Sequence, residues 1–88
     1  MNIQDETEGL IRQIMPVSVP IGPLTNLYLD LGFDSLSLMS LLVQAERTFA
    51  IRFSILEMGE CQWVGRLVAM VTEKTDAAGR KGNVPADD

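Results

Sequence analysis

One short segment of the chain combines a nucleophilic side chain with a place that suits a phosphate. In Asp30-Leu31-Gly32-Phe33-Asp34-Ser35-Leu36, Gly32 permits a tight turn and Asp34 is a residue type that caps helix starts. Ser35 then projects its hydroxyl from the first helical turn, where backbone N–H groups and the helix dipole favour a negative group. These residues fit a phosphodiester attached to Ser35, although Asp34 would repel it to some extent, and on their own they favour the more frequent plain Asp-Ser helix cap.

The composition of the 88 residues excludes several other kinds of chemistry. The chain has no histidine and a single cysteine, Cys61, so His-based catalysis, an internal disulfide, His metal ligands and a thiolate zinc site are excluded. We expect no metal site, and we expect Cys61 to be buried. A net charge of −5 argues against nucleic acid as a partner. Neither a bilayer-spanning run nor a basic signal-peptide start is present, so we expect a cytoplasmic protein without a membrane partner.

Hydrophobic spacing predicts three main helices and one short helix around this segment. Large apolar residues recur every three or four positions in three stretches, as they do on the buried face of an amphipathic helix. A capping box at Ser54 and Glu57 predicts the short helix, which Gly59 ends. The three main helices are expected over about residues 3–15, 35–50 and 62–74.

A long connection separates the first two of these helices. Residues 16–33 contain three prolines but are too apolar for a disordered loop, so we expect them to be strapped across the core, with a turn of helix at 25–29. After Lys74 the apolar pattern stops. The sequence therefore predicts one all-α domain over residues 1–75 and a flexible C-terminal tail over residues 76–88.

The chain resembles the acyl carrier protein family over about residues 3–74. The resemblance rests on the string LGFDSL at residues 31–36, Leu27 and Leu29 before it, a helix ending in Phe49, the residues Ala50-Ile51-Arg52-Phe53, and Val64-Gly65. It implies a four-helix carrier-protein bundle with a long loop between helices 1 and 2. It also implies a carrier that is not an enzyme and has no catalytic residue.

The resemblance further implies that Ser35 carries a 4′-phosphopantetheine arm. A phosphopantetheinyl transferase would join this group, taken from coenzyme A, to the hydroxyl, and the terminal thiol would hold acyl groups as thioesters. The implied partners are this transferase and acyl-loading or acyl-processing enzymes such as a ketosynthase or an acyltransferase. We expect the carrier to be a monomer.

The residues around Ser35 also favour one kind of carrier. Gly32-Phe33-Asp34 resembles acyl carriers of polyketide type. Carriers of fatty-acid synthesis resemble one another in an acidic helix 2, whereas here residues 35–56 hold Glu46 against Arg47 and Arg52. We therefore expect a discrete carrier of specialised, polyketide-like biosynthesis. Two alternatives stay open: an aminoacyl or peptidyl carrier loaded by an adenylating enzyme, and an unmodified helical adaptor.

The second helix presents the residues that partner proteins would recognise. The expected recognition residues are Asp34, Leu36, Met39, Ser40, Val43 and Arg47. Such a face would dock through apolar contacts and hydrogen bonds, with weak charge steering. The alternative is that Met39 and Val43 pack under the long loop. We also expect Trp63 to be a core residue, and the helix after it to lack a strong side-chain cap.

Overall fold

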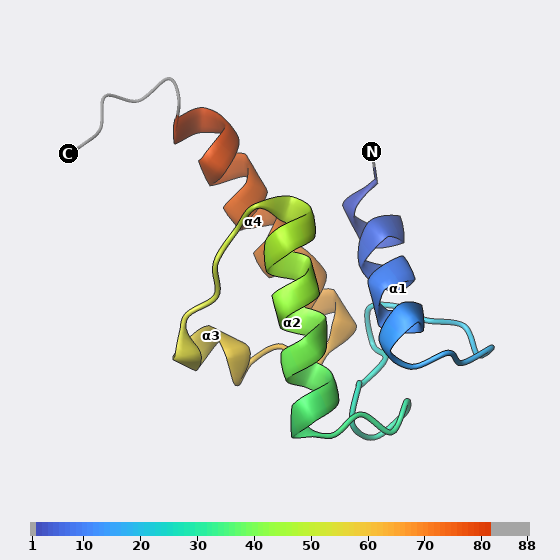
Figure 1. Cartoon of the computed structure of the whole chain (residues 1–88). Helices are drawn as coiled ribbons and strands as arrows, with labels where there is room; N and C mark the ends of the chain where they lie inside the picture. Colours follow the sequence, from blue (N-terminus) through green and yellow to red (C-terminus); the bar gives the residue numbers. More distant parts are fainter. Residues whose placement is uncertain (1, 82–88) are drawn as a thin grey trace.

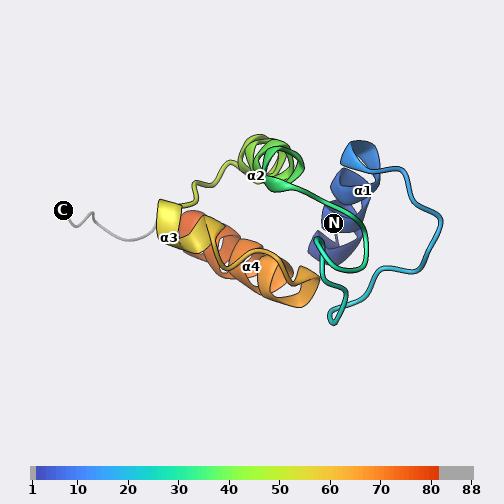
Figure 2. The ribbon, with the colours of Figure 1, turned by 90° about the horizontal axis from the view of Figure 1, so that it is seen from below.

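A computed structural model describes the backbone of residues 2–81 and the side chains of residues 2–77. Its helices are α1 (Ile3–Ile14), α2 (Ser35–Phe49), α3 (Ile55–Met58) and α4 (Val64–Lys81). Within this range the extended backbone pairing is a single bridge between Asn26 and Trp63. Helix α1 packs against α2 and α4, and α2 packs against α4, so the three long helices enclose one core (Figures 1 and 2). The predicted all-α, four-helix architecture is confirmed.

Side chains at the helix ends explain where α1 and α2 begin and stop. The Asn2 side chain accepts the Asp5 N–H at 3.2 Å, and the helix ends as the chain approaches Pro16. Helix α2 begins after Asp34 and closes at Ala50, which adopts the left-handed conformation with φ 57°. Both helices lie within one residue of the predicted bounds.

Helix α4 differs from its prediction at the C-terminal end. It continues to Lys81, past the expected end at residue 74 and across the predicted boundary between domain and tail. Residues 75–81 hold no large apolar residue, so hydrophobic spacing gives no signal there, while Ala77, Ala78 and the two basic residues are good helix formers. The rest of the predicted tail, residues 82–88, lies outside the described residues.

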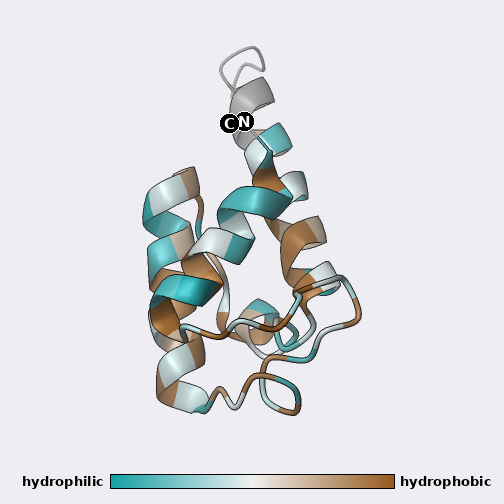
Figure 3. Ribbon diagram, turned by 90° about the vertical axis from the view of Figure 1, so that its right-hand side faces the viewer, coloured by the Kyte–Doolittle hydropathy of each residue, from teal (hydrophilic) through white to brown (hydrophobic). Residues whose placement is uncertain are grey.

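The core is built from one face of each of the three long helices together with buried residues of the segments between them. Apolar residues are found on the helices and on the connecting segments in Figure 3. The predicted stripe of α2 is buried throughout: Leu38, Leu41, Leu42, Ala45 and Phe49. It meets a buried stripe on α4 that consists of Val64, Leu67, Met70 and Val71. Cys61 is fully buried, as expected. Apolar burial on this scale is the main favourable contribution to folding.

Trp63 is the exception, because its side chain is 43% exposed and not in the core. It lies one residue before α4 and is held there by its backbone pairing with Asn26. The buried stripe of α4 starts with Val64, so the next residue along the chain takes the inward position. The expectation of a core tryptophan was wrong for that reason.

The long loop lies against the helices through some of its apolar residues. Ile21, Leu27 and Leu31 are buried, whereas Leu24 and Leu29 are exposed. The Arg12 guanidinium on α1 donates to the carbonyls of Val17 and Val19 and ties the first half of the loop down. Figure 2 shows the loop passing outside α1 and returning to the start of α2. The prediction of an ordered strap is thus confirmed, although fewer leucines are buried than the pattern suggests.

Candidate functional site

Ser35 is the first residue of α2, and it is exposed to solvent. Its hydroxyl forms no hydrogen bond with any residue that the structure describes. The carboxylate of Asp34 caps the helix: one oxygen accepts the Ser37 N–H at 2.8 Å and the Ser37 hydroxyl at 2.9 Å. Asp34 therefore fixes the first turn through Ser37 and leaves the Ser35 hydroxyl available.

The electrostatics of this helix start suit an anion at Ser35. The hydrogen bonds from the Ser37 amide and hydroxyl lower the pKa of Asp34, so this carboxylate stays ionised at neutral pH. The Ser35 amide has no partner among the described residues, whereas the Leu36 amide interacts with the Asp34 carboxylate and helps to lower its pKa. An uncommitted N–H group and an exposed hydroxyl at a helix N-terminus fit a phosphodiester.

A buried asparagine in the long loop holds the approach to Ser35 in place. The side-chain oxygen of Asn26 accepts the N–H groups of Tyr28 and Leu29, each at 2.9 Å. The Asp30 carboxylate accepts a hydrogen bond from the Asn26 N–H at 2.7 Å, and the Phe33 N–H donates to the Leu27 carbonyl at 2.9 Å. Residues 25–29, where a turn of helix is predicted, instead form a hydrogen-bonded turn centred on Asn26, and Gly32 at φ 78° leads out of it.

The same loop caps helix α4 with its backbone. The Val64 N–H donates to the Thr25 carbonyl at 3.0 Å, and the Gly65 N–H donates to the Pro23 carbonyl at 2.9 Å. Helix α4 thus needs no side-chain cap, which explains how it begins directly after a tryptophan. A Cβ atom at Gly65 would lie 2.8 Å from the Pro23 oxygen, so only glycine fits. Sequence reasoning missed Asn26 and Pro23, because their roles lie in contacts between distant segments.

The predicted recognition residues all lie on the exposed side of α2 or at its start. Leu36, Met39 and Val43 are 78%, 49% and 36% exposed, and Ser40 and Arg47 are exposed as well. Leu36, Met39, Ser40, Val43 and Gln44 line one open hollow of about 460 Å³. The long loop does not cover this face, so the alternative that Met39 and Val43 pack beneath it was wrong.

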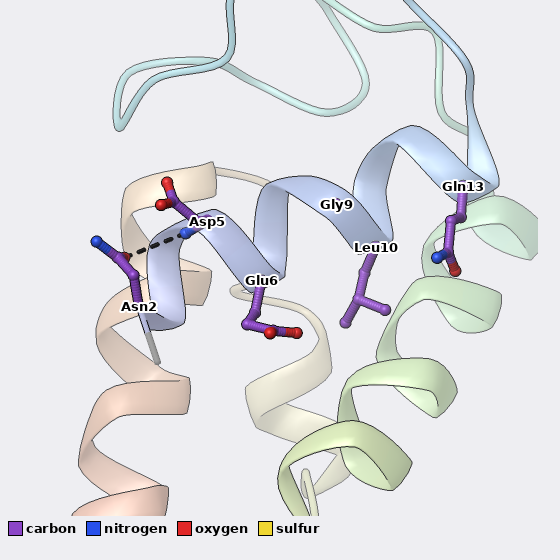
Figure 4. Close-up of a pocket in the computed structure, with 6 residues that line it drawn as sticks. All are labelled: Asn2, Asp5, Glu6, Gly9, Leu10 and Gln13. Carbon is purple, nitrogen blue, oxygen red and sulfur yellow. Dashed lines mark hydrogen bonds between the residues drawn. The ribbon is translucent and has the colours of Figure 1, made fainter.

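A second hollow, shown in Figure 4, lies beside the first turns of α1. Its lining combines Asp5 and Glu6 with Leu10 and three polar or small neighbours. Helices α1 and α2 run in opposite directions, so the start of α1 lies at the other end of the molecule from Ser35 (Figure 1). This hollow therefore takes no part in the site at Ser35.

The described residues hold neither a metal-binding cluster nor a helix suited to crossing a membrane. They contain no cluster of three or more side chains of the kinds that bind metal ions. None of the described helices combines the length and the apolar character that a bilayer crossing requires.

Comparison with protein families matches residues 7–71 to the model of the phosphopantetheine attachment site. This match covers most of the chain and includes the whole of α2. The chain belongs to the family of phosphopantetheine-binding carriers. It is an acyl carrier protein, a carrier and not a catalyst, and its prosthetic group is phosphopantetheine.

Two solved structures resemble this acyl carrier protein along most of their length. A candidate acyl carrier protein from Mycobacterium tuberculosis matches with a TM-score of 0.77 and 28% identity, covering 81% of this chain and 96% of the other. The holo acyl carrier protein of Geobacter metallireducens matches with a TM-score of 0.76 and 28% identity, covering 98% of this chain and 97% of the other. No curated protein sequence matches the chain significantly.

Proposed function

We propose that Ser35 is the phosphopantetheine attachment site and that the protein serves a specialised, polyketide-like pathway. The observation that carries the attachment is the exposed, uncommitted Ser35 hydroxyl at the start of α2. The bound group supplies a thiol that holds acyl chains as thioesters. Because loading draws on coenzyme A, the proposed location of the protein is the cytoplasm.

The pathway assignment rests on the surface that partner enzymes would meet. Gly32-Phe33-Asp34 before the serine is similar to the polyketide type, and the first turn of α2 holds no acidic residue. Fatty-acid carriers present an acidic helix here to basic patches on their partners. This protein instead presents Leu36, Met39 and Val43, which favour apolar docking.

The proposed partners are a phosphopantetheinyl transferase and acyl-processing enzymes such as a ketosynthase or an acyltransferase. Asp34, Leu36, Met39, Ser40, Val43 and Arg47 form the proposed recognition surface. Apolar anchors near the centre of an interface contribute most of its binding energy. Leu36 and Met39 are therefore the residues on which partner turnover should depend most.

Turnover by a polyketide-type ketosynthase tests the pathway and the surface together. The carrier loaded with a malonyl or acetyl group should be turned over faster by this enzyme than by a fatty-acid ketosynthase. Leu36→Glu or Met39→Glu should lower turnover by about tenfold, since loss of an interface anchor costs about 1–2 kcal/mol. Both side chains are exposed, so the midpoint of thermal unfolding should change little.

Leu24→Glu is the matched control, because Leu24 is an exposed leucine on the long loop rather than on α2. It should leave ketosynthase turnover unchanged. Preference for the fatty-acid enzyme would contradict the pathway, and equal losses in all three variants would contradict the surface. Exclusive loading with amino acids by an adenylating enzyme would instead identify an aminoacyl carrier.

A further inference from the structure

The exposed strip of α2 continues beyond its apolar part into a positively charged end. Leu36, Met39, Ser40 and Val43 occupy positions i, i+3, i+4 and i+7 on one face of the helix, and Arg47 follows four residues after Val43. A third open hollow, of about 300 Å³, lies at this end of α2 and is lined by Glu46, Arg47, Ala50, Ile51 and Arg52. The apolar hollow and the charged hollow therefore lie in succession along one helix.

The two arginines at this end are uncommitted. Residues 2–77 contain five basic side chains, and three of them are occupied: Arg12 by loop carbonyls, Arg66 by Glu60 and Lys74 by Glu57. Arg47 and Arg52 make no ion pair or side-chain hydrogen bond with any residue in that range. Both side chains are exposed, so they are free to meet a partner.

The one carboxylate in this hollow is already engaged. Oε2 of Glu46 accepts the Phe53 N–H at 2.9 Å, which ties the end of α2 to the chain leading into α3. Glu46 thus offsets part of the positive charge without pairing with either arginine. The hollow keeps a net charge of +1 and two guanidinium groups, which suit the planar, two-point binding of carboxylates.

From this arrangement we infer that α2 docks partner proteins whose own surface combines a projecting apolar side chain with acidic residues. The apolar side chain enters the hollow at Leu36, Met39 and Val43, and a carboxylate meets Arg47 and Arg52. Arg47 lies twelve residues beyond Ser35, which places this carboxylate about 18 Å along the helix from the modified residue. The inference rests on the proposed function, because it describes the enzymes that act on this carrier.

The charge distribution also explains why such docking would depend only mildly on salt. The acids that give the chain its net charge of −5 lie outside α2 for the most part, including Asp5, Glu6 and Glu8 on α1. Their long-range field repels an acidic partner, while the two arginines attract it at contact. Added salt screens both effects, and the two changes act on binding in opposite directions.

Two synthetic helical peptides test the inference directly. They share the same leucines and differ only in carrying glutamate or lysine at one end. Amide chemical shifts of the ¹⁵N-labelled full chain would report where each peptide binds and how tightly. The glutamate peptide should shift the amides of residues 36–52 and bind about fivefold more tightly than the lysine peptide, the size expected for two exposed ion pairs.

Charge-neutral variants supply the comparison. Arg47→Gln combined with Arg52→Gln should remove the preference for glutamate, whereas Arg66→Gln should preserve it, because Arg66 is an exposed arginine that pairs with Glu60 on another face. Equal binding of both peptides, or shifts confined to α1, would overturn the inference. Self-association of the chain that the double variant abolishes would also overturn it, in favour of a second copy as the occupant.

Loading of the wild-type chain separates this inference from the proposed function. Attachment of phosphopantetheine together with no preference for the glutamate peptide would refute the acidic partner alone. Failure of attachment in a folded chain would refute the carrier function at Ser35, whatever the peptides do.

Discussion

At the scale of single residues, the site depends on the hydrogen bonds between Asp34 and Ser37. The Asp34 carboxylate takes both the amide and the hydroxyl of Ser37, so the helix start is complete without Ser35. Ser35 can therefore be modified with no loss of a structural hydrogen bond. Because Asp34 and Ser37 form the cap, attachment of a group at Ser35 would leave the hydrogen bonds of the helix start intact.

Cys61 should not react with thiol reagents in the native protein. Its side chain is fully buried, and burial, followed by the nearby charges of Glu57 and Glu60, raises its pKa to about 11. At pH 8 the thiol stays protonated and inaccessible. Ellman's reagent should find no reactive thiol in the native unloaded chain, one after denaturation, and one in the native chain after loading.

The Cys61→Ala variant provides the control for this count of thiols. Its unloaded chain should show no reactive thiol after denaturation, and its loaded native chain should still show one. Rapid reaction of the native unloaded protein would contradict the burial of Cys61.

At the scale of elements, the contact between the long loop and α4 is the most tightly constrained part of the fold. Gly65→Ala should destabilise the protein by about 1–3 kcal/mol, because the new Cβ would lie 2.8 Å from the Pro23 oxygen and would strain the hydrogen bond between these residues. In a chain of this size the unfolding midpoint should fall by about 4–8 °C for each kcal/mol. Thermal unfolding followed by circular dichroism measures the change.

Gly9→Ala is the matched control, since Gly9 lies in the middle of α1 with open space around its Cα. This substitution should stabilise the protein by about 0.5–1 kcal/mol, because alanine is the better helix former. Similar effects of the two substitutions would argue against the close contact at Pro23.

The short helix α3 is held by a carboxylate that links three segments. Glu57 accepts the Ser54 N–H at 2.8 Å and pairs with Lys74 of α4 at 2.9 Å, while the Lys74 ammonium lies 5.7 Å from the centre of the Phe53 ring. The hydrogen bond from Ser54 and the pairing with Lys74 lower the pKa of Glu57. The resulting stabilisation is present above the unfolded pKa and is lost as the pH falls through the lower folded pKa.

Glu57→Gln should therefore lower the unfolding midpoint at pH 7, and this effect should shrink as the pH falls through the lowered pKa of Glu57, because the wild-type carboxylate then becomes protonated as well. Unfolding curves recorded over a descending series of pH values test this expectation. Glu60→Gln, which removes an exposed ion pair with Arg66, should cause a smaller change at pH 7. A Glu57→Gln effect that is independent of pH would show that packing, not charge, holds α3.

At the scale of the whole molecule, the positions of the helices can be predicted from the sequence far better than the contacts between the long loop and the helices can. The spacing of Leu38, Leu42 and Phe49 fixes which face of α2 is buried, and Thr7 completes the buried stripe of α1 as its spacing indicates. Such local spacing is enough to indicate which side of a helix is buried. The helical extension to Lys81 contains no large apolar residue in its sequence, so spacing alone ends the helix too early.

The loop shows where sequence reasoning reaches its limit. The loop pairs through backbone groups with a segment about forty residues further along the chain: Pro23 with Gly65, and Asn26 with Trp63. No local sequence pattern predicts such pairs. Trp63 is exposed for the same reason, because the bridge to Asn26 sets its position. Ser35, the proposed attachment site, is predicted from its local motif, whereas the basic end of α2 became apparent only from the folded arrangement of Arg47 and Arg52.

The most direct measurement is the intact mass of the purified chain after incubation with coenzyme A, magnesium and a promiscuous phosphopantetheinyl transferase. Ser35→Ala and Ser40→Ala would run in parallel, since both serines are exposed on α2. The wild type and Ser40→Ala should each gain one phosphopantetheinyl group, and Ser35→Ala should gain none while keeping the same helical content. A gain in Ser35→Ala, or no gain in the folded wild type, would contradict attachment at Ser35.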